Sequence, residues 1–380
     1  MRLVTVLGLL TAATFGASFP AAANDEPVQR LLYVVSPDAA GGRGGKGIYI
    51  FDIDNGHKLV RKIDLPLKGV RGVCGSAVTG RLWISHGDTT ITCLDLKTDK
   101  VLWDKTYDRK DGCDRICVTP DGKKIYVPSG TWSGSPEWKV LDGDSGKELA
   151  RFRPHKSGGG HNAAVSLDGK YVFCASKNNN FLAVVDTETD KVVREVGPVG
   201  GGIHPFSING AATLCYLNTG RAGVGFEVGD LVTGKILHQV KVPGLEGQNR
   251  LCHGIGLSPD EKDVWLNDQG QVHVFDVTGP APKFVETIKL AAAGHGWTTF
   301  SIDGRFAYPD CGDAFDTRTH KAVAQLTDQP NGVGKSVASS KMIEVHFQDG
   351  KVVQIGDQFG LGRKEKGRQD PIPESGPDRS

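Results

Sequence analysis

Six segments of the chain repeat one pattern at intervals of 40 to 49 residues. Each copy has an alternating apolar run, a turn of Pro, Asp or Gly, and a second apolar run, as in HNAAVSLDGKYVF; the copies start at Cys74, Asp114, His161, His204, His253 and Gly296. A third run ending in Asp, such as AVVDTET, and a fourth, such as KVVREV, follow. Alternation with a period of two residues and hairpin turns indicate β-strands. Four strands in about 40 to 50 residues form one blade of a β-propeller, so the sequence predicts an all-β fold.

The strands outside these six units predict how the propeller closes. The units cover about residues 69–327, which leaves three strands before them (LLYVVS, GIYIFDID and KLVRKIDL) and two or three after them. A propeller that builds one blade from both chain ends leaves no exposed edge strand. We therefore expect seven four-stranded blades with terminal-strand closure, and the surplus of terminal strands leaves eight as the alternative. The propeller should span residues 24–361, and residues 362–380, which have no apolar period, should form a disordered tail.

Two of the repeats carry a resemblance to a known family. HNAAVSLDGKYVFCASKNNNFLAVVDTETDKVV and CHGIGLSPDEKDVWLNDQGQVHVFDVT resemble the YVTN-type propeller repeat, whose pattern has an apolar run followed by Ser-Pro-Asp-Gly. The resemblance covers about residues 31–346. It implies the propeller fold, but that superfamily includes surface-layer and binding proteins, lactonases and the large subunit of methylamine dehydrogenase. The resemblance therefore does not select a function.

The first 23 residues have the three parts of a secretory signal peptide. Arg2 precedes an apolar run, and Ala21 and Ala23 form a small-residue cleavage site before Asn24. The run is too short for a membrane-spanning helix, and no later stretch is long enough. We therefore expect an exported protein, periplasmic or secreted, with no transmembrane segment after cleavage. The 45 basic and 44 acidic residues nearly cancel, so nothing favours a nucleic acid as partner.

The eight cysteines limit the cofactors without defining disulfides. An even number in an exported chain permits disulfide bonds, but the spacing does not determine the pairing. The chain has no CxxCH motif, so covalently attached c-type haem is not expected.

The first residues of the repeats should meet at one end of the central channel. In a propeller the first strand of each blade lines this channel, so we expect one polar group made by Cys74, Asp114, His161, His204, His253 and His295. Imidazole, thiolate and carboxylate groups bind zinc or copper, and His161, His204 and His253 are the candidate metal ligands. The alternative is that each histidine only fastens its blade to the next one.

The loops on the same face supply a second set of candidates. Residues 36–47 and 128–138 are insertions, and binding residues are often found on loops that a rigid scaffold presents. Trp132 and Trp138 could stack on a flat or sugar-like ligand, or could fold back onto the blade.

The sequence supports two classes of function and does not decide whether the protein is an enzyme. The first is an exported binding or scaffold protein that holds a small ligand or a protein partner at one channel mouth. The alternative is a periplasmic enzyme, lactonase-like or metal-dependent and redox-active, that works from the histidine-lined mouth with copper or zinc. The fold cannot separate them, because function depends on the site.

Overall fold

The computed structural model describes residues 27–35, 47–219, 223–248, 252–291, 296–339 and 341–364. The expected signal peptide, residues 36–46 of the first insertion, and His295 lie outside these ranges. Within them the chain forms 29 β-strands. The described residues contain no helix that could cross a membrane.

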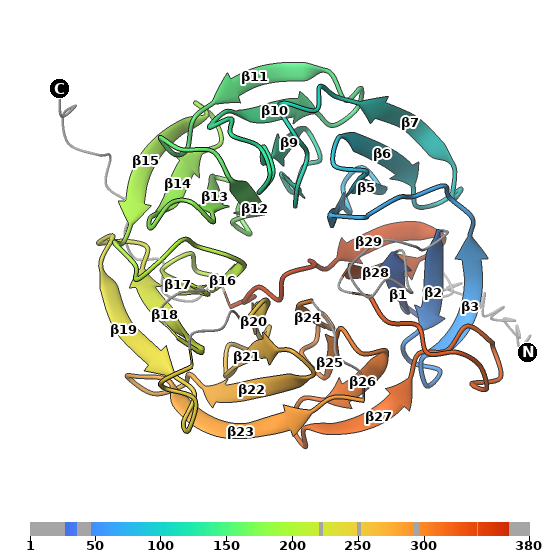
Figure 1. Ribbon diagram of the computed structural model, residues 1–380. Coiled ribbons are helices and arrows are strands. Elements are labelled where there is room, and N and C mark those ends of the chain that lie inside the picture. Colours follow the sequence, from blue (N-terminus) through green and yellow to red (C-terminus); the bar gives the residue numbers. More distant parts are fainter. Residues whose placement is uncertain are drawn as a thin grey trace, which may run out of the picture.

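The strands form seven antiparallel sheets that follow one another around a closed ring (Figure 1). We number these blades I to VII. Blade I contains β1 (Gln29–Val35), β2 (Ile48–Asp52), β3 (Lys58–Ile63), β28 (Met342–Gln348) and β29 (Lys351–Ile355). Blade II contains β4 (Gly72–Ser76), β5 (Arg81–His86), β6 (Thr90–Asp95) and β7 (Val101–Thr106), and blade III contains β8 (Cys117–Val118), β9 (Lys124–Val127), β10 (Trp138–Asp142) and β11 (Glu148–Phe152).

The remaining four blades repeat the same arrangement, with the first strand at the axis and the fourth at the rim. Blade IV contains β12 (Gly160–Val165), β13 (Tyr171–Ser176), β14 (Leu182–Asp186) and β15 (Lys191–Val196). Blade V contains β16 (Phe206–Ile208), β17 (Leu214–Leu217), β18 (Gly225–Asp230) and β19 (Ile236–Lys241). Blade VI contains β20 (Ile255–Leu257), β21 (Asp263–Asp268), β22 (Gln271–Asp276) and β23 (Lys283–Lys289), and blade VII contains β24 (Thr298–Phe300), β25 (Phe306–Pro309), β26 (Asp313–Asp316) and β27 (Lys321–Gln325). The prediction of seven blades is therefore confirmed.

Burial follows the position of a strand within its blade. All six residues of β13 are buried, whereas in β15 only the last valine is buried. Inner strands lie between the faces of two neighbouring blades, and the outermost strand has one side in water. The hydrophobic core therefore lies between the blades rather than in one central layer.

The repeated Asp and Gly residues form the turns, as the sequence predicts. At the end of β14 the Asp186 carboxylate accepts hydrogen bonds from the backbone N–H of Thr189 (2.8 Å) and from its hydroxyl (2.8 Å). At the turn after β12 the Ser166 hydroxyl donates to Asp168 (2.7 Å), and Gly169 takes a φ of 72° that favours glycine. These aspartates are used by the turns and are poor catalytic candidates.

Both chain ends build blade I, which confirms the predicted closure. Strand β28 pairs with β1, and the Arg30 guanidinium donates to the Glu344 carboxylate across this junction (3.1 Å). The blade has five strands rather than four, because β29 adds to the other edge of β28. After β29 the chain crosses the middle of the propeller towards β16 and β20 (Figure 1). We call residues 356–364 the plug segment.

The plug segment corrects the predicted start of the tail. The backbone N–H groups of Gly362 and Arg363 donate to the carbonyls of Ile208 (2.9 Å) and Pro259 (3.1 Å). Residues 362–364 are therefore bound to blades V and VI, and the boundary after Leu361 falls three residues too early. Residues 365–380 lie outside the described ranges.

Candidate functional site

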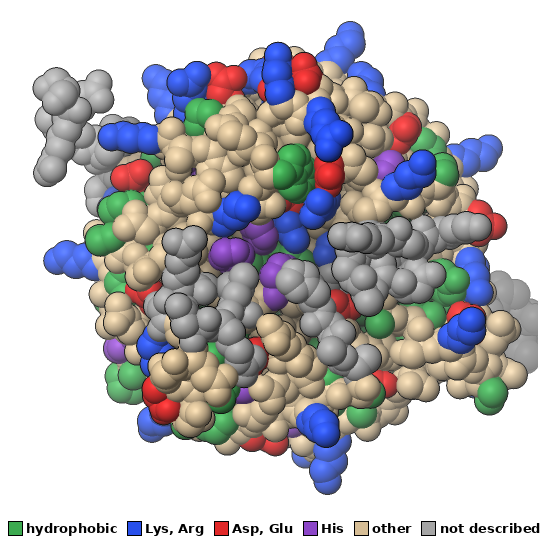
Figure 2. Space-filling model, in the orientation of Figure 1, with side chains coloured by type: hydrophobic (Ala, Val, Ile, Leu, Met, Phe, Trp, Pro, Cys, Tyr) green, Lys and Arg blue, Asp and Glu red, His purple; other side chains and the backbone are tan. Residues whose placement is uncertain are grey.

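One side chain from each blade meets at the axis, at or just before the first residues of the innermost strand. We call these seven residues the axial cluster: Arg71, Arg115, His161, His204, His253, Trp297 and Lys341. Figure 2 shows histidine side chains at the centre of this face with Lys and Arg side chains beside them. The cluster therefore reaches the surface at the mouth of the channel.

The three predicted histidines are brought together. The imidazole of His161 lies 5.5 Å from that of His204 and 6.1 Å from that of His253, measured between ring centroids. His253 in turn contacts Trp297 edge to face at 4.9 Å. His161 is buried, and the other two are partly exposed. The alignment of the repeats therefore located the central histidines correctly.

Two basic side chains share the indole of Trp297. The guanidinium carbon of Arg115 lies 4.9 Å from the ring centroid, and the ammonium nitrogen of Lys341 lies 4.6 Å from it. Both side chains are almost fully buried, with 7% of each residue exposed. Such cation–π contacts offset part of the cost of burying a charge.

Asp114 is the acidic member of this region. Its carboxylate is buried, contacts the Arg115 guanidinium, and accepts a hydrogen bond from the backbone N–H of Thr131 (3.4 Å). Burial raises the pKa of Asp114 and lowers the pKa of Arg115, and the contact between the two charges opposes both shifts. Asp114 therefore acts as the counter-ion of Arg115.

Cys74 does not join the cluster. It pairs with Trp83 and packs against the core between blades II and III, where burial raises the pKa of its thiol well above the usual value. The residue of blade II at the axis is Arg71, which precedes Ser76 at the turn by five positions, as His161 precedes Ser166. The sequence alignment was therefore displaced by three residues in this blade.

The two tryptophans of the 128–138 insertion have different environments. Trp138 is the first residue of β10 and is 1% exposed, so it is a core residue and the proposal that it stacks on a ligand is wrong. Trp132 is 36% exposed and lines a groove of about 810 Å³, and the Arg71 guanidinium carbon lies 4.4 Å from its ring centroid. Trp132 therefore lies next to the axial cluster.

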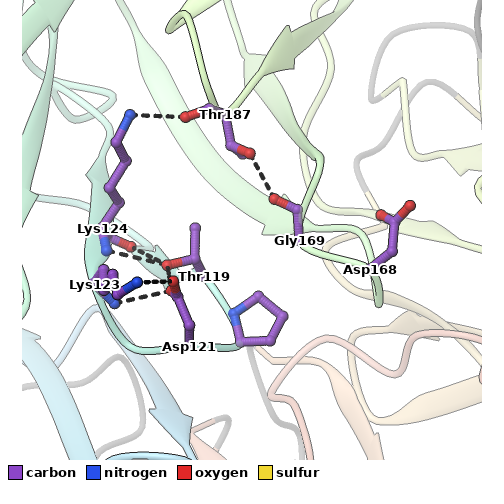
Figure 3. A pocket seen from close by; sticks show the side chains of 8 residues that line it. Thr119, Asp121, Lys123, Lys124, Asp168, Gly169 and Thr187 are labelled. Carbon is purple, nitrogen blue, oxygen red and sulfur yellow. Dashed lines mark hydrogen bonds and ion pairs between the residues drawn. The ribbon is translucent and has the colours of Figure 1, made fainter.

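A smaller pocket lies on blades III and IV, and several of its polar groups are hydrogen-bonded to one another (Figure 3). It has a volume of about 320 Å³ and lies beside the turns that contain Asp121 and Asp168. Lys124 donates to the Thr187 carbonyl (2.7 Å), and the Thr187 hydroxyl donates to the Gly169 carbonyl (2.6 Å). These groups hold the turns together, so this pocket is a weaker candidate.

The basic and aromatic members of the axial cluster were missed by the sequence analysis. Arg115 and Trp297 each stand one position after the first residue of a repeat, the position that Asn162 occupies in blade IV. A comparison of the second residue of each repeat would have identified both. Lys341 lies in the closing blade, outside the six aligned repeats, and had no such signal.

Among the described residues, no group of three or more His, Cys, Asp or Glu side chains is arranged to hold a metal ion. The surroundings of His161 also disfavour one. Burial first, and then the charges of Arg115, His204 and Lys341, lower the pKa of His161 well below its usual value. The positive charges that disfavour a proton on His161 also repel a divalent cation. The structure therefore does not support His161, His204 and His253 as a metal site.

Blades III and IV are joined beside His161 by backbone hydrogen bonds. The backbone carbonyl of His161 accepts from the Arg115 N–H (3.2 Å), and the Arg115 carbonyl accepts from the Ala163 N–H (3.1 Å). The His161 ring nitrogen Nδ1 instead lies 3.1 Å from Oδ1 of Asn162. Because an amide oxygen only accepts, Nδ1 carries the proton and Nε2 is left as an acceptor. The backbone therefore fastens blades III and IV here.

The plug segment lies across the channel behind the axial cluster. The Phe359 ring is 5.8 Å from Trp297 between centroids, and the Gly360 carbonyl accepts from the Leu257 N–H (2.7 Å), four residues beyond His253. The side-chain oxygen of Gln358 accepts from the Val73 N–H (2.8 Å). The cluster therefore faces the surface on one side and the plug segment on the other.

Four buried N–H donors in this region have no hydrogen-bond acceptor among the described residues. They belong to Arg115 (Nε), Asn162 (Nδ2), Trp297 (Nε1) and Gln358 (Nε2). The backbones of Arg115 and Asn162 form a β-bridge, and the Arg115 guanidinium lies over the Trp297 indole. Phe359, the residue after Gln358, contacts the same indole. A buried donor that makes no hydrogen bond costs about 1–3 kcal/mol. The arrangement is therefore suited to a ligand that supplies acceptor atoms.

Lys341 is a titratable group of the axial cluster whose pKa lies near neutral pH. Burial, followed by the charge of Arg115, lowers the pKa of Lys341 to about 7, although Asp310 and Asp114 oppose the shift. The unfolded chain holds this proton up to the ordinary pKa of about 10.4. Burial of the charged side chain therefore lowers the unfolding free energy by its full amount below pH 7. This loss becomes smaller as the pH rises from about 7 towards the ordinary pKa of about 10.4.

We expect Lys341→Met to stabilise the protein most at low pH. The difference in unfolding free energy between the variant and the wild type should be largest near pH 6 and should shrink above pH 7, by at most about 1.4 kcal/mol per pH unit. Urea unfolding over this pH range measures it, with the exposed Lys351→Met as the matched control. Equal pH profiles for wild type and Lys341→Met would show that Lys341 stays charged throughout.

The comparisons with known proteins agree on the fold. No protein-family model and no curated protein matches this chain. Among solved structures, it is similar to hydrazine synthase of Kuenenia stuttgartiensis, with a TM-score of 0.58 and 14% identity over 76% of this chain and 93% of that chain. It is also similar to the β-propeller domain of Cps50 (Swd1) from Myceliophteria thermophila, with a TM-score of 0.58 and 9% identity over 79% of this chain and 97% of that chain. At these identities the similarity shows the β-propeller fold alone.

Proposed function

We propose that this chain is an exported binding protein whose axial cluster holds one small anionic molecule. The signal-peptide pattern of residues 1–23 supports export, to the periplasm or outside the cell. The propeller supports a binding role in general, because it presents one residue from each of seven blades to a common point. The resemblance to YVTN-type repeats is compatible with this role and does not specify the ligand.

The observation that carries the proposal is the convergence of buried donors at the axis. Arg115, Asn162 and Trp297 come from three different blades, and each has a buried N–H group with no acceptor among the described residues. Burial alone disfavours a charge of either sign, so the donors decide the sign of the ligand. These three groups are donors, and an anion offers several acceptor atoms to them.

The basic residues favour the same choice. Arg115 has Asp114 as its counter-ion, and Arg71 has Asp88, at 2.5 Å between the guanidinium and the carboxylate. Lys341 adds a further positive charge below about pH 7. A small anion would restore hydrogen bonds to the donors and reduce the repulsion between Arg115 and Lys341. These two effects offset the loss of the anion's hydration.

Isothermal titration calorimetry of the purified protein tests this function. We expect phosphate, sulfate, oxalate or pyruvate, titrated at constant ionic strength near pH 6, to include an anion that binds with one site per chain. The same anion should raise the melting temperature, because a ligand at 100 times its Kd stabilises by about 2.7 kcal/mol. Acetamide and acetone, which are neutral and of similar size, should not bind.

Titration with zinc and copper ions completes the experiment. The proposal expects neither cation to bind at the axial cluster. Tight binding of either ion, lost in His161→Ala and His204→Ala and without any anion binding, would overturn the proposal in favour of a metal-dependent protein.

A further inference from the structure

Lys341 is buried at the axis of the propeller, whereas most lysines lie on the surface. It stands immediately before β28, its backbone N–H donates to the Ser339 hydroxyl (3.0 Å), and 7% of the residue is exposed. Its nitrogen lies 4.6 Å from the centroid of Trp297, a ring that Arg115 also contacts. Burying an ammonium beside a guanidinium costs stability, and such costs are typical of functional sites.

The neighbours of Lys341 supply the other groups that amine chemistry needs. The Arg115 guanidinium is a donor for a carboxylate, with its Nε proton without an acceptor among the described residues. The His161 imidazole lies 6.4 Å from Trp297 between ring centroids, and its bond to Asn162 leaves Nε2 as a hydrogen-bond acceptor. An amine, a carboxylate-binding group and a neutral imidazole therefore surround one indole.

We propose that Lys341 forms a Schiff base with a small 2-oxo acid held by Arg115, an inference that rests on the anion-binding function proposed above. The Nζ lone pair of Lys341 attacks the ketone or aldehyde carbon, a C–N bond forms, and the carbonyl oxygen becomes a hydroxyl group. Loss of this oxygen as water leaves an imine. One amine and one carbonyl compound thus give one imine and one water, with no oxidant or reductant involved.

The protonation states suit this chemistry. A lysine attacks only as the neutral amine, and burial together with the charge of Arg115 lowers the pKa of Lys341 to about 7. His161 is neutral, because burial and the adjacent charges lower its pKa, so Nε2 can accept a hydrogen bond from the hydroxyl group that forms while the amine proton passes to that oxygen. The carboxylate next to the carbonyl would contact Arg115 and hold the carbonyl carbon near the amine.

Reductive trapping tests the proposal directly. The full-length protein is incubated near neutral pH with pyruvate and sodium cyanoborohydride, and its peptides are then mapped by mass spectrometry. We expect one carboxyethyl group per chain, on the peptide that contains Lys341. Acetone, which has a methyl group in place of the carboxylate, should label this lysine at least about tenfold more slowly, because it lacks the charge-assisted contact with Arg115.

Lys341→Arg separates the two proposals. This variant keeps the positive charge but has no reactive amine, so it should still bind pyruvate in the calorimeter and should lose the trapped adduct. Labelling of wild type spread over exposed lysines such as Lys351, or labelling unchanged in Lys341→Arg, would overturn the Schiff base and leave anion binding standing. The peptide map of the wild type decides the question even if the variant does not fold. If no tested anion binds and no adduct forms, both proposals fail together.

Discussion

A chain that ends at Gly356 should have an unfolding free energy about 5 kcal/mol or more below that of a chain that ends at Lys364. The two chains differ only in most of the plug segment. Phe359 and Leu361 are 3% and 7% exposed and belong to the core cluster of blades IV and V. Losing two large buried side chains costs about 2–5 kcal/mol each. The Val73 N–H group would also lose its acceptor on Gln358, at about 1–3 kcal/mol, and the Leu257 N–H group would lose the Gly360 carbonyl and keep the Ser207 hydroxyl.

Urea unfolding followed by tryptophan fluorescence measures this difference. Phe359→Ala in the full chain gives an independent value without truncation, and Phe284→Ala is its matched control, because Phe284 is 37% exposed on the outermost strand of blade VI. We expect a loss of about 3 kcal/mol or more for Phe359→Ala and a much smaller loss for the control. Equal unfolding midpoints for the chains ending at Gly356 and Lys364 would show that the plug segment does not stabilise the propeller.

The second large effect concerns affinity. Arg115→Gln should weaken the binding of the preferred anion about 10- to 100-fold, because a hydrogen bond to a charged group contributes about 1.5–3 kcal/mol. Arg318→Gln makes the same chemical change at an exposed turn of blade VII and should leave the affinity unchanged. Calorimetry at constant ionic strength measures both dissociation constants. A similar loss in both variants would mean that only the overall charge of the protein matters.

The pH dependence of the same binding gives a second measure. Above about pH 7 Lys341 is neutral, so one positive charge near the anion is lost. The affinity should therefore fall as the pH rises from 6 to 8, with uptake of a proton on binding in the upper part of this range. Lys341→Met should bind more weakly at pH 6 and should show a flatter profile. A wild-type affinity that is constant over this range would contradict the role given to Lys341.

The repeated strand pattern was sufficient to predict the architecture. Runs such as YVFCAS and LAVVD alternate with Asp and Gly turns, and the resulting hairpins stack because inner strands bury both faces. The same regularity placed His161, His204 and His253 at one channel mouth, because each stands at or just before the start of an equivalent strand. It failed at Cys74, because the alignment of blade II was displaced by three residues, and at Trp138, which is the first residue of β10 and is buried.

The sequence by itself predicted a propeller with seven blades, or eight as the alternative, its closure by both chain ends and the face on which the central histidines meet, because each of these follows from local periodicity. Only the tertiary structure decided the character of that site. Arg115, Trp297 and Lys341 belong to blades III, VII and I, and no local pattern relates residues so far apart in the chain. Closure of the ring brings them around one indole, and their shared burial sets the pKa of Lys341. The plug segment reaches the axis for the same reason: its partners on blades II, V, VI and VII become neighbours only when the propeller is complete.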